Sequence, residues 1–504
     1  MSTQPVIEIA AKPSDQSQLG ALDLGSNSFH LLVAKSQDGR VQVIDKHKEM
    51  VRLAAGITAE NRLSEAAQER ALECLERFAQ RLRPLDPNNV RVVGTNTLRK
   101  ANSPEFLAQA ESILGHKINI ISGREEARLI YLGVCHDLGI TDKRRLIVDI
   151  GGGSTEIVSG KRLQPDVLES LYMGCVSMTH KHFSDGQISA SRMAAAVTDA
   201  RLELEPVATE FSHAGWDAAL GTSGTINAMR EVIHKLYDSP CITLEHIDDL
   251  VSQLCTFKTL DSIQLTGLAE ERKVVFPGGV AILKAVFEAL GIERMETSQG
   301  ALREGLIVDL IGRQDAFDTR AETVAQLMKR FNVDGAQARC IRETSISLLS
   351  QLAQVWDLTS ATHKDMLSWA ADLMEVGMDI SHSGYHKHGS YLLEHMDMPG
   401  FSRDEQRQIA TLVRCHRRKI PTELFTAADQ ALKYLTVILR IATVLHRNRN
   451  HESPPHVSAQ GTANGLALKL SSTWLARHPL TALDLQSEQY YLKNLGIELT
   501  VDGY

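Results

Sequence analysis

The pattern of apolar and polar residues divides the first 310 residues into short strands that alternate with amphipathic helices. Two apolar runs, 21–24 and 29–34, flank the small polar turn 25–28, which predicts a β-hairpin. Apolar residues recur at helical spacing over 64–82 and predict a helix there. The pattern continues with a strand at 90–93, a loop at 94–99, a helix near 104–114, a strand at 118–121 and a helix from about Gly123.

The same order of elements then starts again. An apolar strand at 146–150 leads into the turn 151–155, and a second strand follows at 156–159. Placing Asp149 on Asp23 superposes the two hairpins and gives an internal repeat of about 126 residues. Such a repeat is far longer than a solenoid period, so it predicts two similar lobes of the α/β class.

From about Arg313 the pattern becomes nearly all helical, apart from a possible strand pair at 465–470 and 497–501. We therefore predict an α/β protein with two lobes, a mainly helical domain and a small α+β segment. The predicted division is 1–19 as a disordered leader, 20–139 as lobe I, 140–312 as lobe II, 313–450 as the helical domain and 451–504 as the α+β segment.

Composition narrows the class of protein. With 43% hydrophobic and 23% charged residues, the chain resembles ordinary soluble globular proteins. The N-terminus lacks the apolar core of a signal peptide, and the apolar run 435–445 is interrupted by Arg440 and Thr443. Seven scattered cysteines without a C-x-x-C pair argue for reduced thiols in the cytoplasm, against a disulfide framework or a zinc site.

Charge is distributed unevenly. The net charge of −8 argues against attraction of the whole molecule to nucleic acid. Within 401–450, however, ten basic residues face four acidic ones, a local charge of +6. A track for a polyanion and a solvated helix face both explain this segment, and the sequence leaves the two open.

Small-residue turns are the first sign of chemistry. Both hairpin turns follow an aspartate, and their backbone N–H groups can converge on phosphate oxygens because few Cβ atoms obstruct them. A third loop at 221–225 opens a helix, whose N-terminus favours an anion, although a plain β-to-α turn has the same sequence. Arginine matches phosphate geometry, so Arg99 and Arg272 are further candidates, with ordinary surface arginines as the alternative. The predicted phosphate contacts are Gly25, Ser26, Asn27, Ser28, Arg99, Gly151, Gly152, Gly153, Ser154, Thr155, Gly221, Ser223, Gly224, Thr225 and Arg272.

Acidic residues near these turns suggest how a phosphate could be attacked. Ser122 and Glu125 fit a capping box at the start of a helix, which leaves Glu126 free to face the turns as a general base. The alternative is that both glutamates only complement the helix dipole. Asp149 and Glu156, with Asp23 on the first hairpin, are predicted to bind Mg²⁺ or another divalent cation, because Mg²⁺ prefers few carboxylates plus phosphate oxygens.

The C-terminal part contains five histidines within 35 residues, together with basic side chains. Histidines can bind metal, but no convincing partner acids accompany these, and a basic substrate track explains them better. The predicted polyphosphate channel consists of His386, Lys387, His388, Arg414, His416, Arg417, Arg418 and Lys419.

Seven motifs, in order and spacing over the first 310 residues, resemble the exopolyphosphatase and guanosine pentaphosphate phosphatase family, within the superfamily of actin, sugar kinases and chaperone ATPases. They start at residues Asp23 (DLGSNSFH), Gly94 (GTNTLR), Ser122 (SGREEARLI), Asp149 (DIGGGSTE), Met173 (MGCVS), Gly221 (GTSGT) and Gly300 (GALREGL). The resemblance implies two actin-like, ribonuclease-H-like lobes with the site between them. It also implies that Glu126 is the catalytic base, that Asp149 and Glu156 serve the metal, and that the glycine turns hold phosphates.

The C-terminal part is similar to the third domain of the longer family members, which resembles HD-type phosphohydrolases. Met374-Glu375 stands where an HD domain carries its His-Asp pair, and Thr443 stands where a later aspartate is expected. Methionine does not hold magnesium, so we predict a degenerate metal site. The segments from Tyr385 and Cys415 then resemble a polyphosphate channel or a dimer surface.

These observations lead us to expect a cytoplasmic exopolyphosphatase that uses Mg²⁺ and water to release terminal phosphates. The first alternative is removal of the 5′-terminal phosphate of guanosine pentaphosphate, and one chain could perform both reactions. An actin-like ATPase or sugar kinase, and an inactive nucleotide-sensing scaffold, are the rivals from other classes. We expect a homodimer that binds no nucleic acid and has no stable membrane insertion; a peripheral position at the inner membrane stays open.

Overall fold

The computed structural model describes residues 17–37, 40–314, 318–426, 430–449 and 457–503. The chain forms two compact units, Met1–Asp318 and Thr319–Tyr504. Most of the predicted leader, residues 1–16, lies outside the described residues. The end of the predicted leader is wrong, because the first strand already begins at Gln18 and Leu19 is fully buried.

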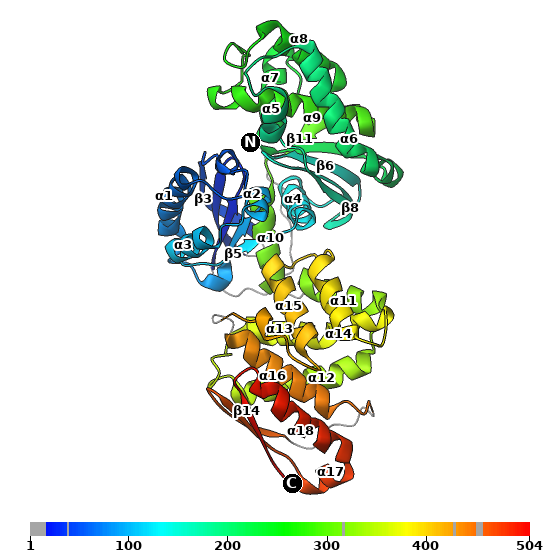
Figure 1. The fold of residues 1–504 in the computed structure, drawn as a ribbon. Coiled ribbons are helices and arrows are strands. Elements are labelled where there is room, and N and C mark those ends of the chain that lie inside the picture. The colour runs from blue at the N-terminus through cyan, green and yellow to red at the C-terminus, as the bar shows by residue number, and fades with distance from the viewer. Residues whose placement is uncertain (1–16, 38–39, 315–317, 427–429, 450–456, 504) are drawn as a thin grey trace. The chain divides into compact units, whose positions relative to one another are not determined.

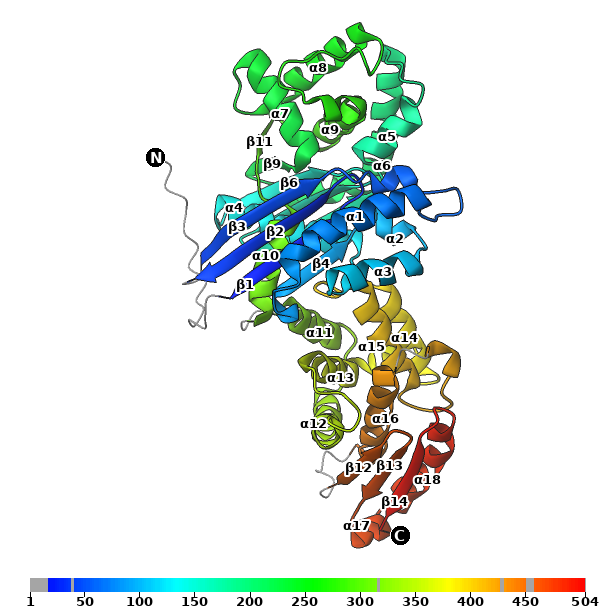
Figure 2. The same ribbon diagram turned by 90° about the vertical axis from the view of Figure 1, so that its left-hand side faces the viewer.

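The first unit contains two sheets that repeat one topology (Figures 1 and 2). In each sheet the first strand lies between an antiparallel hairpin partner and a parallel later strand. The first sheet has the order β3-β2-β1-β4-β5, formed by β1 (Gln18–Leu24), β2 (Phe29–Gln37), β3 (Arg40–Glu49), β4 (Val90–Gly94) and β5 (Ile118–Ile120). The second has the order β8-β7-β6-β9-β11-β10, formed by β6 (Arg144–Ile150), β7 (Thr155–Lys161), β8 (Gln164–Leu171), β9 (Ala218–Thr222), β10 (Ile242–Thr243) and β11 (Arg294–Thr297).

Helices follow the strands of both sheets. Around the first sheet these are α1 (Glu65–Leu82), α2 (Asn96–Lys100), α3 (Pro104–Leu114) and α4 (Gly123–Leu138). Around the second they are α5 (Cys175–His182), α6 (Ala190–Ala214), α7 (Ser223–Tyr237), α8 (Leu244–Phe257), α9 (Phe276–Leu290) and α10 (Leu302–Gln314). The mixed α/β class and the repeat of strand order predicted from the sequence are therefore both present.

Helices α4 and α10 hold equivalent places, since α4 follows β5 and α10 follows β11. They pack on one another, and their apolar side chains share one core with residues of both sheets. Three glycines make this approach possible. A Cβ on Gly133 would collide with the Ala301 carbonyl, one on Gly305 with the Leu129 carbonyl, and one on Gly300 with Gly133. The two helix backbones are thus in direct contact.

Four buried charges reinforce the same contact. Arg128 on α4 donates from Nε to Glu125 Oε2 at 2.8 Å and from Nη2 to Asp309 Oδ1 of α10 at 2.6 Å. Arg91 on β4 also pairs with Asp309. Because each of these side chains is almost fully buried, removal of one partner would leave an uncompensated charge inside the unit.

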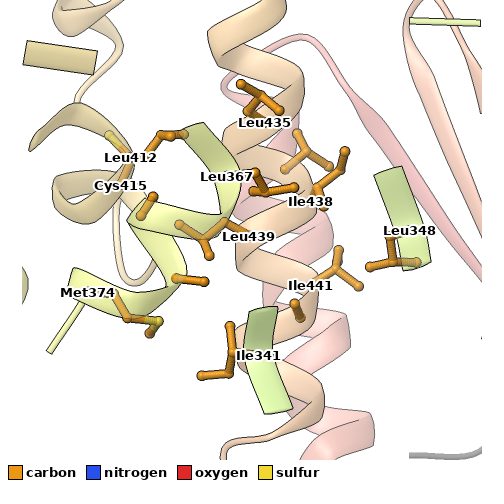
Figure 3. Packing of buried hydrophobic residues seen from close by; sticks show 14 of the residues in the cluster. Ile341, Leu348, Leu367, Met374, Leu412, Cys415, Leu435, Ile438, Leu439 and Ile441 are labelled. Atoms are coloured by element: carbon orange, nitrogen blue, oxygen red, sulfur yellow. The ribbon is translucent and has the colours of Figure 1, made fainter. Parts of the chain in front are cut away.

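The second unit is mainly helical, as predicted. Its helices are α11 (Thr319–Arg330), α12 (Gly335–Leu352), α13 (Ala361–Leu373), α14 (Tyr385–His395), α15 (Arg403–Cys415), α16 (Gln430–Leu445), α17 (Ser472–Arg477) and α18 (Pro479–Lys493). A single apolar cluster around α16 unites them, and Figure 3 shows Leu435, Ile438 and Ile441 of α16 packed against neighbouring helices. A sheet of β12 (Ser458–Thr462), β13 (Gly465–Lys469) and β14 (Glu498–Asp502) completes the unit.

Several local predictions need correction. The loop predicted at 94–99 contains the short helix α2, and the strands β3, β8 and β12 were not anticipated. The helix predicted to follow the loop 221–225 starts within that loop, at Ser223 of α7. Among the helices of the described residues, none combines the length and the apolar character that crossing a bilayer requires.

Candidate active site

A cavity of about 320 Å³ lies between the two hairpin turns of the first unit. Both turns contribute to its wall, and so do the N-terminal ends of α4, α7 and α10. Its lining includes Asp23, Gly25, Ser26, Asn27, Ser28, His30, Lys48, Thr95, Glu126, Asp149, Gly151, Gly152, Ser154, Glu156, Cys175, Thr222, Ser223, Gly224, Thr225, Asn227, Arg272, Gln299 and Arg303. The sequence motifs thus come together in one space.

The turn 151–154 is held from behind by helix α5. The backbone N–H of Cys175 donates to the Gly151 carbonyl at 2.9 Å, and that of Val176 donates to the Gly152 carbonyl at 2.9 Å. A Cβ at Gly174 would collide with Gly152 and Gly153, so only glycine allows this approach. The carbonyls of Gly151 and Gly152 are bonded to α5, and the Gly151 N–H is bonded to the Ser154 carbonyl, so the N–H groups of residues 152–154 are the ones left to bind an anion.

Glu126 lies in the first turn of α4 and faces the cavity. The N-cap residue Ser122 accepts a hydrogen bond from the Glu125 N–H at 3.1 Å, which is one half of the predicted capping box. The Glu125 side chain does not complete the box but pairs with Arg128. Arg99 donates from Nη1 to Glu126 Oε2 at 2.6 Å, and within the described residues no hydrogen bond engages Glu126 Oε1.

Three further buried carboxylates surround Glu126. Burial, followed by repulsion from Glu126, raises the pKa of Asp149 to about 7. Burial and then the charge of Glu126 also raise the pKa of Asp23 and of Glu156 well above their usual values. This concentration of negative charge is unfavourable by itself and is typical of a site that receives a cation.

The donor set fits a magnesium ion that is completed by substrate. Asp149 and Glu156 face each other across the β6–β7 hairpin, and Asp23 Oδ1 is buried without a hydrogen-bond partner within the described residues. Within those residues no group of three or more His, Cys, Asp or Glu side chains forms a ready cation cage. Magnesium commonly binds through one or two carboxylates plus phosphate oxygens, so Asp149 and Glu156 are the residues that would hold it.

Basic side chains also line the cavity. Arg272, from the 3-10 helix η3 (Glu270–Val275), packs so closely on Gly224 that a Cβ there would collide with its guanidinium. Burial, followed by the charges of Arg272 and Arg303, lowers the pKa of Lys48. Three basic groups that repel one another are suited to a ligand with several negative charges.

The structure places the predicted residues in two groups. Most of the predicted phosphate contacts line the cavity, but Arg99, Gly153, Thr155 and Gly221 are not among its lining. Thr155 instead donates to the Met173 carbonyl at 2.6 Å, which is a structural role. Sequence reasoning missed the lining residues His30, Lys48, Asn227, Gln299 and Arg303, although His30 and Arg303 stand within quoted motifs.

The predicted channel residues of the second unit fall around two neighbouring pockets. His386, Lys387, Arg414, Arg418 and Lys419 line one. The other has a volume of about 400 Å³ and is lined by His416, Arg417 and Arg418 together with Tyr385, Arg447 and Arg449. His388 lines neither pocket, whereas Arg418 reaches both.

The residues compared with an HD metal site do meet in the second unit. Thr443 Oγ1 lies 3.9 Å from the Met374 sulfur and donates to the Leu439 carbonyl at 2.7 Å. Glu375 is occupied by an ion pair with Arg449. The degenerate metal site therefore stays a prediction, now with its residues side by side.

Buried histidines make the second unit sensitive to acid. Burial lowers the pKa of His416 to about 3, against about 6.5 in an unfolded chain. Its stabilising contribution is therefore complete above pH 6.5 and is lost as the pH falls towards 3. We expect the unfolding free energy of the wild type to fall by about 1.4 kcal/mol per pH unit below 6 more than that of His416→Asn.

Tryptophan fluorescence can measure this, because Trp356, Trp369 and Trp474 belong to the second unit and only Trp216 to the first. Urea titrations of both proteins between pH 7 and 4 give the two slopes. If the unfolding free energies of the wild type and His416→Asn changed with pH by the same slope, the prediction of a lowered pKa for His416 would be wrong.

Comparison with known proteins gives the family. Residues 32–314 match the Ppx/GppA phosphatase family, and residues 319–489 match Ppx/GppA phosphatase, domain III. The chain is 40% identical over 482 residues, 94% of its length and 97% of the relative's, to the guanosine-5′-triphosphate,3′-diphosphate pyrophosphatase of Aeromonas hydrophila subsp. hydrophila. It is 37% identical over 486 residues, 96% of its length and 97% of the relative's, to the protein of that name from Photobacterium profundum.

Among solved structures, the fold is similar to that of an exopolyphosphatase from Cytophaga hutchinsonii, with a TM-score of 0.53 and 23% identity. The alignment covers 59% of this chain and 98% of that protein. The family resemblance drawn from the motifs is confirmed. This chain belongs to the Ppx/GppA phosphatase family and is a hydrolase of phosphoric anhydrides.

Proposed function

We propose that this phosphatase removes the terminal 5′-phosphate of guanosine-5′-triphosphate,3′-diphosphate. The observation that carries the proposal is the cavity that the two hairpin turns and Glu126 line together. The names of relatives that match nearly the whole chain at 37% and 40% identity support the substrate. They favour the nucleotide, which the sequence alone placed second to polyphosphate.

The turns and basic side chains supply binding of the phosphates. The N–H groups of residues 25–28 and 152–154 can donate hydrogen bonds to phosphate oxygens, and the N-terminus of α7 adds its dipole. Arg272 and Lys48, which also line the cavity, compensate the remaining negative charge of the bound phosphates. These groups are fixed before substrate arrives, which is the condition for stabilising charge that develops during reaction.

In the chemical step, the oxygen of a water molecule attacks the terminal phosphorus in line with the bond that breaks. The proton of this water passes to Glu126 Oε1, while Arg99 holds Glu126 Oε2 and fixes the carboxylate plane. The bond to the bridging oxygen breaks, and its electron pair leaves with the shortened nucleotide. The products are orthophosphate and the nucleotide with one phosphate fewer.

We further propose that Asp149 and Glu156, with Asp23, hold Mg²⁺ at this site. When bound, the ion would neutralise charge on the phosphate oxygens, as in other phosphoryl-transfer enzymes. The same charge would relieve the mutual repulsion of carboxylates that contributes to the raised pKa values of Asp23, Asp149 and Glu156. Another divalent cation of similar size would serve the same residues.

Long-chain polyphosphate is the second candidate substrate. The pocket of Lys387, Arg414, Arg418 and Lys419 in the second unit supports it, because these four basic side chains line it together with a single acid, Glu423. A polyanion gains affinity from each unpaired basic group that it meets. The expected homodimer stays a prediction that sedimentation can test.

One panel of substrates tests these proposals. Orthophosphate release with Mg²⁺ is measured for the guanosine nucleotide, long-chain polyphosphate, GTP and ATP. We expect the highest kcat/KM for guanosine-5′-triphosphate,3′-diphosphate. A higher kcat/KM for polyphosphate would reverse the two candidates, and ATP-dependent phosphorylation of an acceptor without hydrolysis would support the kinase rival.

A variant separates the two substrates further. Replacing Lys387, Arg414 and Lys419 by glutamine should raise KM for polyphosphate and leave kcat/KM for the nucleotide within a factor of two, about 0.4 kcal/mol. Equal losses for both substrates would show that this pocket has no part in substrate choice.

A further inference from the structure

Three side chains that line the cavity form a continuous hydrogen-bond chain. Arg303, at the start of α10, lies with Nη1 2.9 Å from His30 Nδ1. The other ring nitrogen, His30 Nε2, lies 2.8 Å from Ser28 Oγ. Ser28 ends the first phosphate turn, so this series of hydrogen bonds connects α10 to the turn through His30 of strand β2.

The arginine fixes the direction of every bond in this chain. A guanidinium has only donors, so Nη1 must donate and His30 Nδ1 must accept. The ring proton is therefore on Nε2, and it is donated to Ser28 Oγ. An imidazolium would direct an N–H at the guanidinium. In agreement with this, burial, followed by the charges of Arg303, Lys48 and Arg272, lowers the pKa of His30 to about 3.

Arg303 itself is held in place. Its Nε donates to Glu304 Oε1 at 3.0 Å, and Lys46 Nζ donates to the same oxygen at 3.1 Å. The other oxygen, Glu304 Oε2, accepts from the Ala301 N–H at 3.0 Å. The donor that sets the tautomer of His30 is thus anchored to its own helix and to strand β3.

The proton on His30 Nε2 determines the direction in which the Ser28 hydroxyl can donate. Since Ser28 Oγ accepts the proton of His30, its own hydrogen must be donated elsewhere. Within the described residues no other bond to Ser28 Oγ is formed, and the side chain borders the cavity. We propose that His30 and Arg303 are positioning residues that fix the Ser28 hydroxyl as a donor to a phosphate oxygen of the substrate.

This polarity matters because ionised phosphate oxygens are acceptors only. A serine hydroxyl can rotate and act as donor or acceptor. If Ser28 donated to His30, it would present lone pairs to the phosphate and repel it. The hydrogen bonds from Arg303 to His30 and from His30 to Ser28, here called the relay, prevent Ser28 from donating to His30. The hydroxyl hydrogen of Ser28 is therefore available to the phosphate before the anion binds. The inference rests on the proposed phosphate-binding role of this turn.

Binding of inorganic tripolyphosphate to a Glu126→Gln background, measured by calorimetry with Mg²⁺, tests these hydrogen bonds while turnover is strongly reduced. We expect Ser28→Ala and His30→Leu each to weaken binding about 10- to 100-fold, since a hydrogen bond to a charged group is lost. The double variant should bind no more weakly than Ser28→Ala alone. His30→Gln should keep most of the affinity, because its amide can still donate to Ser28. Additive losses, or equal losses for Gln and Leu, would overturn the proposal.

A direct observation of the ring completes the test. Long-range ¹H–¹⁵N correlation spectra of the whole protein, with His30→Gln to assign the signal, should show the Nε2–H tautomer from pH 5.5 to 8. An Nδ1–H tautomer or an imidazolium would refute the relay. This result does not depend on which anhydride the enzyme hydrolyses, so loss of the nucleotide proposal and loss of the relay are distinguishable. Melting temperatures of all variants show whether each is folded.

Discussion

Glu126→Gln is expected to reduce kcat for phosphate release about 10²- to 10⁴-fold, because general-base catalysis typically contributes that factor. Glutamine has nearly the same shape and can still accept from Arg99, but its amide cannot take a proton from water. KM should change far less than kcat, since in the proposed binding mode the phosphates contact the two hairpin turns.

The variant should remain folded. Neutralising one of four buried carboxylates relieves the repulsion that raises the pKa of Asp149 and Glu156, and this offsets the weakened pair with Arg99. Glu169→Gln is the matched control, because Glu169 pairs with Arg124 near the same helix end but does not line the cavity. A folded Glu126→Gln protein with more than a tenth of the wild-type kcat would rule out this base.

Glu488→Gln should lower the unfolding free energy of the second unit by about 3–5 kcal/mol, the range for loss of one partner from a buried ion pair. Arg440 is fully buried and donates from Nε to Glu488 Oε2 at 2.6 Å and from Nη2 to Oε1 at 2.8 Å. It also donates to the carbonyl of Cys415 and, at 3.0 Å, to that of Arg418. The pair thus connects α16, α18 and the end of α15.

Urea unfolding followed by tryptophan fluorescence measures the loss. The control is Asp404→Asn, which removes the partner of Arg407 in an exposed pair and should cost at most about 1 kcal/mol. Arg418, whose carbonyl accepts a hydrogen bond from Arg440, has a backbone φ of 63°. Such a strained conformation persists only where the surrounding structure enforces it. Equal effects of the two substitutions would mean that the buried pair contributes little.

The sequence predicted the parts of the fold that carry a strong local pattern. Hairpins around residues 25–28 and 151–154 were visible because apolar runs flank small residues, and their repetition predicted two lobes. Strands β3 and β8 were missed because both lie at sheet edges and carry polar residues, as in Arg40–Glu49. Edge strands commonly expose charges, so only pairing with a neighbour reveals them.

Residues of the candidate site were likewise predictable only where they leave a local pattern in the sequence. The glycine turns and Glu126 were recognisable because close approach and helix capping leave local signatures. Lys48 and Arg303 were not, since nothing in their surroundings shows that β3 and α10 end at the same cavity. Arg99 was predicted to bind phosphate, yet it pairs with Glu126, a choice that depends on geometry between α2 and α4.

The glycine contact between α4 and α10 has a mechanical consequence. Glu126 stands three residues after Gly123, and Arg303 three residues after Gly300, at matching places of the two repeats. Because the two backbones touch at Gly133 and Gly305, one helix cannot slide past the other there without a clash. A shift of either helix should therefore carry Glu126 and Arg303 along together.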